Sequence, residues 1–134
     1  RHDVILITNM FGDILSNAAS AMAGGLGLAA ALNAGDEHAA ANAAHGSAPD
    51  IAGRDQANPV SLILSCAMLL EWLGTRRQRN VLTAAAKAIE GAVDACLADP
   101  DSRTADIGGR LGTRAFAAAV VGRLEKSAAK LAAA

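Results

Sequence analysis

The segment best suited to ligand chemistry is the nine-residue loop His45-Gly-Ser-Ala-Pro-Asp-Ile-Ala-Gly53. It places small residues, one proline and one acid between two regular elements, so the backbone of the loop can approach a ligand closely. Gly46 leaves room for a bulky anion, and the main-chain N–H groups of Ser47 and Ala48 are available as donors to phosphate oxygens. The loop is therefore a candidate site for a phosphorylated ligand.

Asp50 has a specific use within this loop. A carboxylate accepts hydrogen bonds from both vicinal hydroxyls of an adenosine ribose, but it repels a phosphate esterified at the 2′ position. This chemistry favours NAD over NADP as the cofactor. Judged by residue types alone, the alternative is that Pro49 and Asp50 make only a structural turn.

The first part of the chain must position a polar helix face. The apolar, β-branched run from Val4 to Thr8 predicts a strand covered on both faces. The pattern after it predicts a helix whose polar side begins with the carboxylate of Asp13, in its first turn. Glycines at 24, 25 and 27 are expected to end that helix, and the connection to His45 is expected to be a loop with at most one short strand.

Three more helices are predicted after the loop. Asn58 followed by Pro59 is a strong helix start, and the helix is expected to stop at Gly74. It is apolar nearly all round, which predicts burial in the core or in a subunit interface. A stripe of apolar residues from Leu82 to Cys96 predicts an amphipathic helix that ends at Asp99-Pro100. After a polar loop over 101–112, a last helix from Thr113 is expected to bury Phe116, Val120, Val121 and Leu124.

Composition bounds the class of protein. The 134 residues are 52% apolar and 19% charged with a net charge of −1, so one soluble domain is expected and neither disorder nor a nucleic-acid surface is indicated. Aromatic residues make up 2%, and the abundance of alanine favours packed helices. Cys66 and Cys96 are expected to be buried thiols in a reducing compartment. No apolar run is long enough for a membrane span, which suggests a cytoplasmic protein, and Arg1 suggests an internal starting point.

Two long segments resemble the β-decarboxylating dehydrogenases that act on isopropylmalate, isocitrate, homoisocitrate, tartrate or malate. Asp3-Val-Ile-Leu-Ile-Thr-Asn-Met-Phe-Gly-Asp13-Ile-Leu-Ser16 resembles the strand, turn and helix that present a metal-binding acid in that family. The loop from His45, continued through Ala57-Asn58-Pro59, is similar to the family's adenine-side cofactor loop. Further similarity, in the family's order, lies at Gly24–Leu28, Leu64–Leu70 and Arg103–Gly109 followed by Thr113. The match covers nearly the whole chain.

The resemblance implies a fold and a set of site residues. The fold class is α/β, with residues 1–134 forming a single partial domain: the C-terminal part of the isopropylmalate-dehydrogenase-like α/β/α fold, dominated by helices with few strands. The implied cofactor-binding residues are His45, Gly46, Ser47, Ala48, Pro49, Asp50, Ile51, Ala52, Gly53 and Asn58, of which Asn58 faces adenine. Asp50 and Ile51 match the NAD-preferring version, whereas NADP-using relatives tend to have lysine and tyrosine there.

The resemblance also implies a divalent metal. Asp13 falls at the position of a metal-ligating aspartate, and the oxygen ligands of such a site select Mg²⁺ or Mn²⁺. A simple helix cap is the alternative role for Asp13. Where the family commonly has a second acid, this chain has Asn17, on the same helix face but neutral. The loss of that charge is expected to weaken metal binding, so Asn17 is only a weak metal-site residue.

The implied function is the C-terminal part of an NAD-dependent, Mg²⁺- or Mn²⁺-assisted oxidative decarboxylase of a 2-hydroxy acid. Members of the family carry substrate-binding arginines, a tyrosine, a lysine and another metal-ligand acid in a long N-terminal portion that this sequence does not contain. The 134 residues are therefore expected to be inactive alone, and no residue of theirs is assigned to catalysis. The resemblance also implies a homodimer. The alternatives are a noncatalytic adenine-nucleotide-binding module and a helical interaction module.

Overall fold

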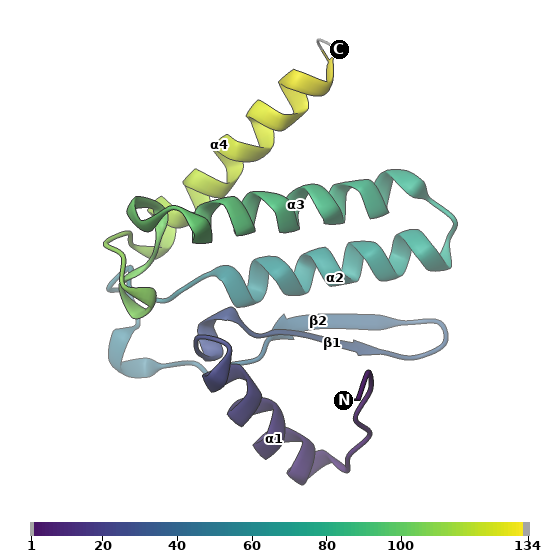
Figure 1. Ribbon diagram of the computed structural model, residues 1–134. Coiled ribbons are helices and arrows are strands. Elements are labelled where there is room, and N and C mark those ends of the chain that lie inside the picture. The colour runs from purple at the N-terminus through teal and green to yellow at the C-terminus, as the bar shows by residue number, and fades with distance from the viewer. Residues whose placement is uncertain (1, 133–134) are drawn as a thin grey trace.

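Four α-helices and one two-stranded sheet are the main elements of the described residues. The computed structural model describes residues 2–132, and side chains as far as residue 128. The elements in chain order are α1 (Asn9–Met22), β1 (Ala30–Ala34), β2 (Ala39–Ala43), α2 (Val60–Arg76), α3 (Asn80–Ala98) and α4 (Thr113–Ala132). The hairpin of β1 and β2 lies along one side of α2, and α3 lies along the other (Figure 1). α4 contacts α3 and then leaves the body at an angle. The expected helix-dominated fold with few strands is confirmed.

The hydrophobic core lies where α2, α3 and α4 meet. Phe116 of α4 is fully buried in one cluster with Val60 of α2 and Val93 and Cys96 of α3, and Val120 joins the same cluster. Residues three or four positions apart share a helix face, so the apolar stripes of the sequence become the buried faces of these helices. The predicted burial of Phe116, Val120 and Cys96 is confirmed.

The segment between α1 and the nine-residue loop forms a β-hairpin, so the prediction of at most one strand there was wrong. The strands are antiparallel, with Ala30 opposite Ala43 and Ala34 opposite Ala39. The N–H of Gly35 closes the turn by donating to the carbonyl of His38 over 2.9 Å. Alanine and asparagine dominate both strands and have low strand propensity, which explains why no strand pattern is visible in the sequence.

Two serine hydroxyls of α2 hold this hairpin in place. The hydroxyl of Ser61 donates to the carbonyl of Ala29 and accepts from the N–H of Ala44, which lies 3.1 Å away. The hydroxyl of Ser65 accepts from the N–H of Ala31 over 3.0 Å. Both serines are fully buried, so these bonds satisfy polar groups that would otherwise lie in an apolar environment. Main chain on both strands is therefore fixed to one face of α2.

The predicted buried strand at Val4–Thr8 was wrong. Residues 4–8 have no regular secondary structure, and the side chains of Val4 and Leu6 are 85% and 97% exposed. Among the described residues, nothing pairs with this segment, because the sheet contains only β1 and β2. α1 also contains no buried residue and contacts the short 3-10 helix Leu26–Leu28. Residues 2–22 thus present large apolar side chains that the described part of the chain does not cover.

α2 differs from its prediction at its end and on one face. It continues through Gly74 to Arg76, because Gly74 marks the close approach of α3 and does not end the helix. A Cβ at Gly74 would lie 2.6 Å from Cγ2 of Thr83. Cys66 is exposed, so its predicted burial was wrong, and Leu62 is 51% exposed. The face of α2 that carries Leu62 and Cys66 lies away from both the hairpin and α3.

The burial predicted for α4 was wrong at Val121, which is 52% exposed. Only the adjacent Val120 packs into the hydrophobic core cluster. Leu124, further along the helix, packs against the cluster while remaining partly exposed. Between residues 2 and 132, no helix is both long enough and apolar enough for a bilayer span.

Candidate cofactor site

A cavity of about 670 Å³ opens between the nine-residue loop, the start of α2 and the start of α4. Its volume is in the range of small-molecule and cofactor sites. Residues 45–48 and 51–53 of the loop line it, and so does Asn58. Pro49 and Asp50 are not among the lining residues, although both belong to the same turn. The structure therefore brings together most of the residues that sequence analysis assigned to the cofactor.

The loop has the backbone shape that its small residues permit. Ala48 has φ 43°, in the left-handed region, and the 3-10 helix Pro49–Ile51 follows it directly. The N–H of Ile51 donates to the carbonyl of Ala48 over 3.1 Å. Asp50 is exposed in the first turn of this short helix. Its carboxylate therefore lies at the solvent-facing turn of the loop, next to residues that line the cavity.

Asn58 connects three parts of the site. Its Oδ1 accepts from the N–H of Val60, the first residue of α2, over 3.0 Å. The predicted N-cap was one residue off, because Pro59 and not Asn58 occupies that position. Its Nδ2 donates to Oδ2 of Asp106 over 3.0 Å. The third part is Gly27, where an added Cβ would lie 3.0 Å from Cβ of Asn58 and 3.2 Å from Oδ2 of Asp106. Asn58 is 7% exposed, so its amide is held in one orientation at the edge of the cavity.

The start of α4 forms another wall and is fixed to the end of the loop. Oδ1 of Asp55 accepts from the N–H of Arg114 over 2.9 Å, and the carbonyl of Asp55 accepts from the N–H of Thr113 over 3.1 Å. The hydroxyl of Thr113 donates to the carbonyl of Ala57 over 2.5 Å. An acid at a helix N-terminus also interacts favourably with the helix dipole. Asp55 thus caps α4 and fixes the chain between the loop and α2.

Seven residues that line the cavity were not predicted as part of the site: Gly27, Asp55, Gln56, Ala57, Asp106, Thr113 and Arg114. Asp55, Gln56 and Ala57 follow closely after the nine-residue loop, whereas the other four come from segments far from it in the sequence, so no local spacing connects those four to the loop. Gly27, Ala57, Asp106 and Thr113 lie in segments that resemble the family, and this resemblance is the sequence signal that could have found them.

Asp13 and Asn17 lie outside the cavity lining. Both are on α1, where Asn17 is half-buried and Asp13 is exposed. Because α1 begins at Asn9, Asp13 lies in the second turn and its predicted place in the first turn was wrong. No group of three or more His, Cys, Asp or Glu side chains suited to a metal occurs in the described part of the chain. Asp13 therefore belongs to no such group within the described residues.

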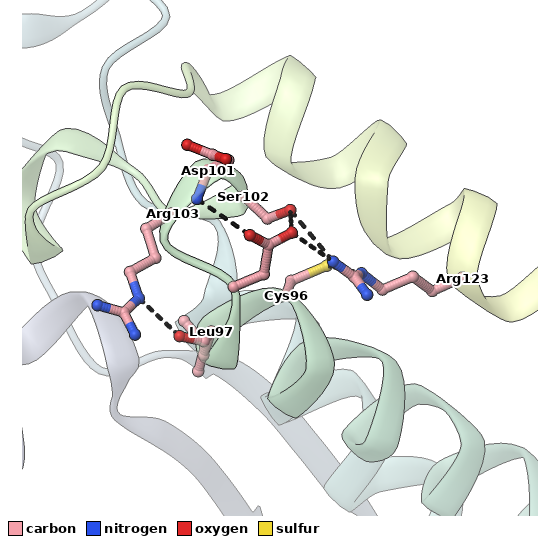
Figure 2. Close-up of polar contacts among 7 residues, drawn as sticks. Cys96, Leu97, Asp101, Ser102, Arg103 and Arg123 are labelled. Atoms are coloured by element: carbon pink, nitrogen blue, oxygen red, sulfur yellow. Dashed lines mark hydrogen bonds and ion pairs between the residues drawn. The ribbon is translucent and has the colours of Figure 1, made fainter.

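A polar cluster behind the site joins the end of α3 to α4. The Asp99 carboxylate accepts hydrogen bonds from the hydroxyl of Ser102 over 2.7 Å, from the N–H of Asp101 over 3.1 Å and from Nη2 of Arg123 over 3.0 Å. These partners lower the pKa of Asp99 below its ordinary value, with the Ser102 hydroxyl as the largest cause. Figure 2 shows the Arg123 guanidinium reaching from α4 toward Ser102 and Cys96.

Comparison with known proteins places the chain in a family. The family model described as isocitrate/isopropylmalate dehydrogenase matches residues 1–120. The isocitrate/homoisocitrate dehydrogenase of Thermus thermophilus is 50% identical over 125 residues, which cover 93% of this chain and 35% of that protein. A probable NAD isocitrate dehydrogenase subunit alpha of Caenorhabditis elegans is 38% identical over 125 residues, which cover 93% of this chain and 33% of that protein.

Solved structures agree with the sequence comparison. The crystal structure of isocitrate dehydrogenase from Methylococcus capsulatus matches with a TM-score of 0.79 and 44% identity, covering 87% of this chain and 33% of that one. The chain therefore spans about a third of the length of the relatives that it matches. The α/β/α fold implied by the resemblance is confirmed for this part.

Proposed function

Because the chain belongs to the isocitrate/isopropylmalate dehydrogenase family, we propose that it is the C-terminal, adenosine-binding part of an NAD-dependent oxidative decarboxylase of a 2-hydroxy acid. The observation that carries the proposal is the cavity of about 670 Å³ lined by both the nine-residue loop and Asn58. In the whole enzyme, NAD accepts a hydride from the 2-hydroxy acid, and the oxidised product then loses carbon dioxide.

The residues of the cavity suit the adenosine half of a dinucleotide. Gly46 and Gly53 leave the loop backbone accessible, since a Cβ at either position would meet nothing within 4 Å. The Asp50 carboxylate, exposed on the loop turn, would accept hydrogen bonds from the two ribose hydroxyls and repel a 2′-phosphate. The name of the Caenorhabditis elegans relative, which specifies NAD, supports the same choice of cofactor.

The metal part of the proposal rests on Asp13 and Asn17. An exposed carboxylate and an amide four residues later on one helix provide oxygen ligands of the kind that Mg²⁺ and Mn²⁺ prefer. Two side chains do not fill the coordination sphere of either ion, so the substrate and acids from outside this chain would supply the rest. Such an ion would bind the hydroxyl and carboxylate of the substrate and stabilise the negative charge left by decarboxylation.

The uncovered surface of residues 2–22 supports the idea that the enzyme has a further part. Large apolar side chains are exposed there at Val4, Ile5, Leu6, Met10, Phe11, Ile14, Leu15 and Met22. A concentration of exposed large apolar side chains in one segment is typical of an interface. The relatives are about three times as long as this chain. We therefore propose that the remaining two thirds of a dehydrogenase fold cover these apolar side chains and carry the substrate-binding residues. A homodimer, as in the family, is part of the same proposal.

Calorimetric titration of the chain with NAD and with NADP tests the cofactor assignment. NAD is expected to bind more tightly, and Asp50→Ala is expected to weaken NAD binding about tenfold because hydrogen bonds to a charged acceptor are lost. Asp101→Ala is a matched control, since Asp101 also follows a proline in an exposed 3-10 turn but lies away from the cavity. Tighter binding of NADP, or unchanged NAD binding by Asp50→Ala, would contradict the assignment.

The metal assignment requires the chain joined to the N-terminal part of a dehydrogenase. In that enzyme, Asp13→Ala is expected to raise the Mg²⁺ or Mn²⁺ concentration needed for half-maximal NADH formation, because one carboxylate ligand is lost. Asp3→Ala removes an exposed acid from the same segment and serves as the control. An identical metal requirement for Asp13→Ala and the control would remove Asp13 from the site.

A further inference from the structure

A second cleft, of about 480 Å³, lies between α3 and the second half of α4, the helix that leaves the body of the molecule at an angle (Figure 1). Three bases line this α3–α4 cleft, namely Lys87 of α3 and Arg123 and Lys126 of α4, and Ser127 adds a hydroxyl. No acid is among its lining residues in the described part of the chain, although the whole sequence has 13 acids and 12 Lys and Arg. A cleft lined by charges of one sign attracts ions of the opposite sign.

The two lysines are available to a ligand, whereas the arginine is largely used within the protein. Lys87 and Lys126 are exposed, and neither forms an ion pair with an acid of the described residues. Nε of Arg123 lies 3.1 Å from Sγ of Cys96, and its Nη2 lies 3.0 Å from Oδ2 of Asp99. Only Nη1 of this guanidinium is left for a ligand, so the arginine cannot present the two-nitrogen fork that suits a carboxylate.

Small residues make the α3 side of the cleft hollow. They are Ala88, Gly91, Ala92 and Ala95, and an added Cβ at Gly91 would meet nothing within 4 Å. The volume of the cleft lies in the range of small-molecule sites, so it has room for an organic group beside a bound anion. The cleft shares no lining residue with the candidate cofactor cavity, which makes it a separate site.

We propose that the α3–α4 cleft binds a small organic phosphate ester, with the phosphate held by Lys87 and Lys126 and the organic part against the alanines of α3. A phosphate monoester concentrates a charge of about −1.5 to −2 in one group at pH 7. The ammonium groups of lysines act as point charges, which suit such a compact anion, whereas a planar carboxylate is matched best by the arginine fork that is missing here. The proposal does not depend on the proposed function, because the cofactor takes no part in it.

Titration of the chain with glycerol 3-phosphate, followed by the NMR chemical shifts of the backbone amides, both locates the ligand and measures its affinity. Saturable shifts are expected at Ala88, Gly91 and Ala95 of the cleft. Succinate, a dianion whose charges lie on two separate carboxylates, is expected to bind more weakly. Shifts confined to residues 45–53 would place the phosphate in the other cavity and overturn the proposal. Equal affinity for succinate would overturn the preference for phosphate.

Matched variants separate a site in the cleft from a diffuse attraction of anions. Lys126→Gln is expected to weaken binding of glycerol 3-phosphate about fivefold, because one exposed cation is lost. Arg77→Gln removes an exposed cation outside the cleft and is expected to leave the affinity unchanged. Gly91→Leu keeps every cation but places a side chain in the open space, so it is expected to abolish binding while circular dichroism shows the helices intact. Wild-type affinity in either Lys126→Gln or Gly91→Leu would overturn the proposal.

Discussion

Nη2 of Arg123 on α4 lies 3.0 Å from Oδ2 of Asp99 at the end of α3. The same guanidinium places its Nε 3.1 Å from Sγ of the buried Cys96. One side chain therefore joins an ion pair at the surface to the edge of the hydrophobic core. Because α4 begins at the candidate cofactor cavity, contacts that orient α4 against α3 also support one wall of that cavity.

Replacing Arg123 with methionine should lower the melting temperature by a few degrees. Methionine keeps most of the aliphatic contact but removes the ion pair with Asp99, which is exposed enough for solvent to weaken it. Thermal unfolding followed by circular dichroism measures the change. Arg110→Met, at an exposed arginine whose side chain forms no ion pair in the described structure, is the control. Equal melting temperatures for the two variants would contradict this role of Arg123.

Acid should weaken the attachment of α4 through the Asp99 carboxyl. Its pKa is lowered from an ordinary 3.8 by the Ser102 hydroxyl, the Asp101 N–H and the Arg123 charge. The folded pKa lies below the unfolded one, so this contribution to stability is complete above the ordinary value and is lost as the pH falls through the folded pKa. Urea unfolding from about pH 5 downward should show a smaller loss of stability in Asp99→Asn than in the wild type. The same pH dependence of stability in Asp99→Asn and in the wild type would contradict this role of Asp99.

The helical part of the fold was predictable because its signal is local. The apolar stripe from Leu82 to Cys96 predicts a helix, and α3 buries Val93 and Cys96 as that stripe requires. The start of α2 is also local, since Asn58 and Pro59 directly precede the helix and the amide oxygen of Asn58 accepts from the N–H of its first residue. Residues that stabilise an element from within a few positions can be recognised without knowledge of the fold.

The remaining features depend on contacts between distant segments. The hairpin strands are mostly alanine and are held by Ser61 and Ser65 of α2, more than 15 residues away in the chain. The run from Val4 to Thr8 has the composition of a strand, yet no described strand lies beside it to pair with. In the site, Asn58 and Asp106 are 48 positions apart. Only tertiary structure brings such residues together, so their roles could not be derived from sequence spacing.

The junction of α2, α3 and α4 should depend strongly on Phe116. This side chain is fully buried in the core cluster, so Phe116→Ala leaves a cavity and should cost about 3–5 kcal/mol in the free energy of unfolding. Val121→Ala, at a half-exposed position of the same helix, should cost far less. Urea titration followed by helical circular dichroism compares the two. A similar loss at both positions would show that α4 does not depend on this core.

The hairpin should loosen when the hydroxyl of Ser65 is removed. Ser65→Ala leaves the N–H of Ala31 without its 3.0 Å acceptor in a part-buried position, at a cost of about 1–3 kcal/mol. Hydrogen exchange of the Ala31 amide should become faster than in the wild type. Ser16→Ala, which removes an exposed hydroxyl bonded only within α1, should leave that amide unchanged. Unaltered exchange in Ser65→Ala would show that pairing with β2 is sufficient to hold β1.

Two glycines within helices should respond to alanine in opposite directions. Alanine is favoured over glycine in a helix by about 1 kcal/mol, but a Cβ at Gly74 would lie 2.8 Å from the backbone nitrogen of Thr83 and 2.6 Å from its Cγ2. Relieving that clash requires α2 and α3 to separate, and overpacking of this kind costs about 1–3 kcal/mol, so Gly74→Ala should destabilise the fold. At Gly91 of α3 an added Cβ meets nothing within 4 Å, so Gly91→Ala should stabilise it by nearly the full propensity difference. The urea midpoints of Gly74→Ala and Gly91→Ala, each compared with the wild type, test this prediction. A higher midpoint in both variants would mean that α2 and α3 do not approach each other at Gly74.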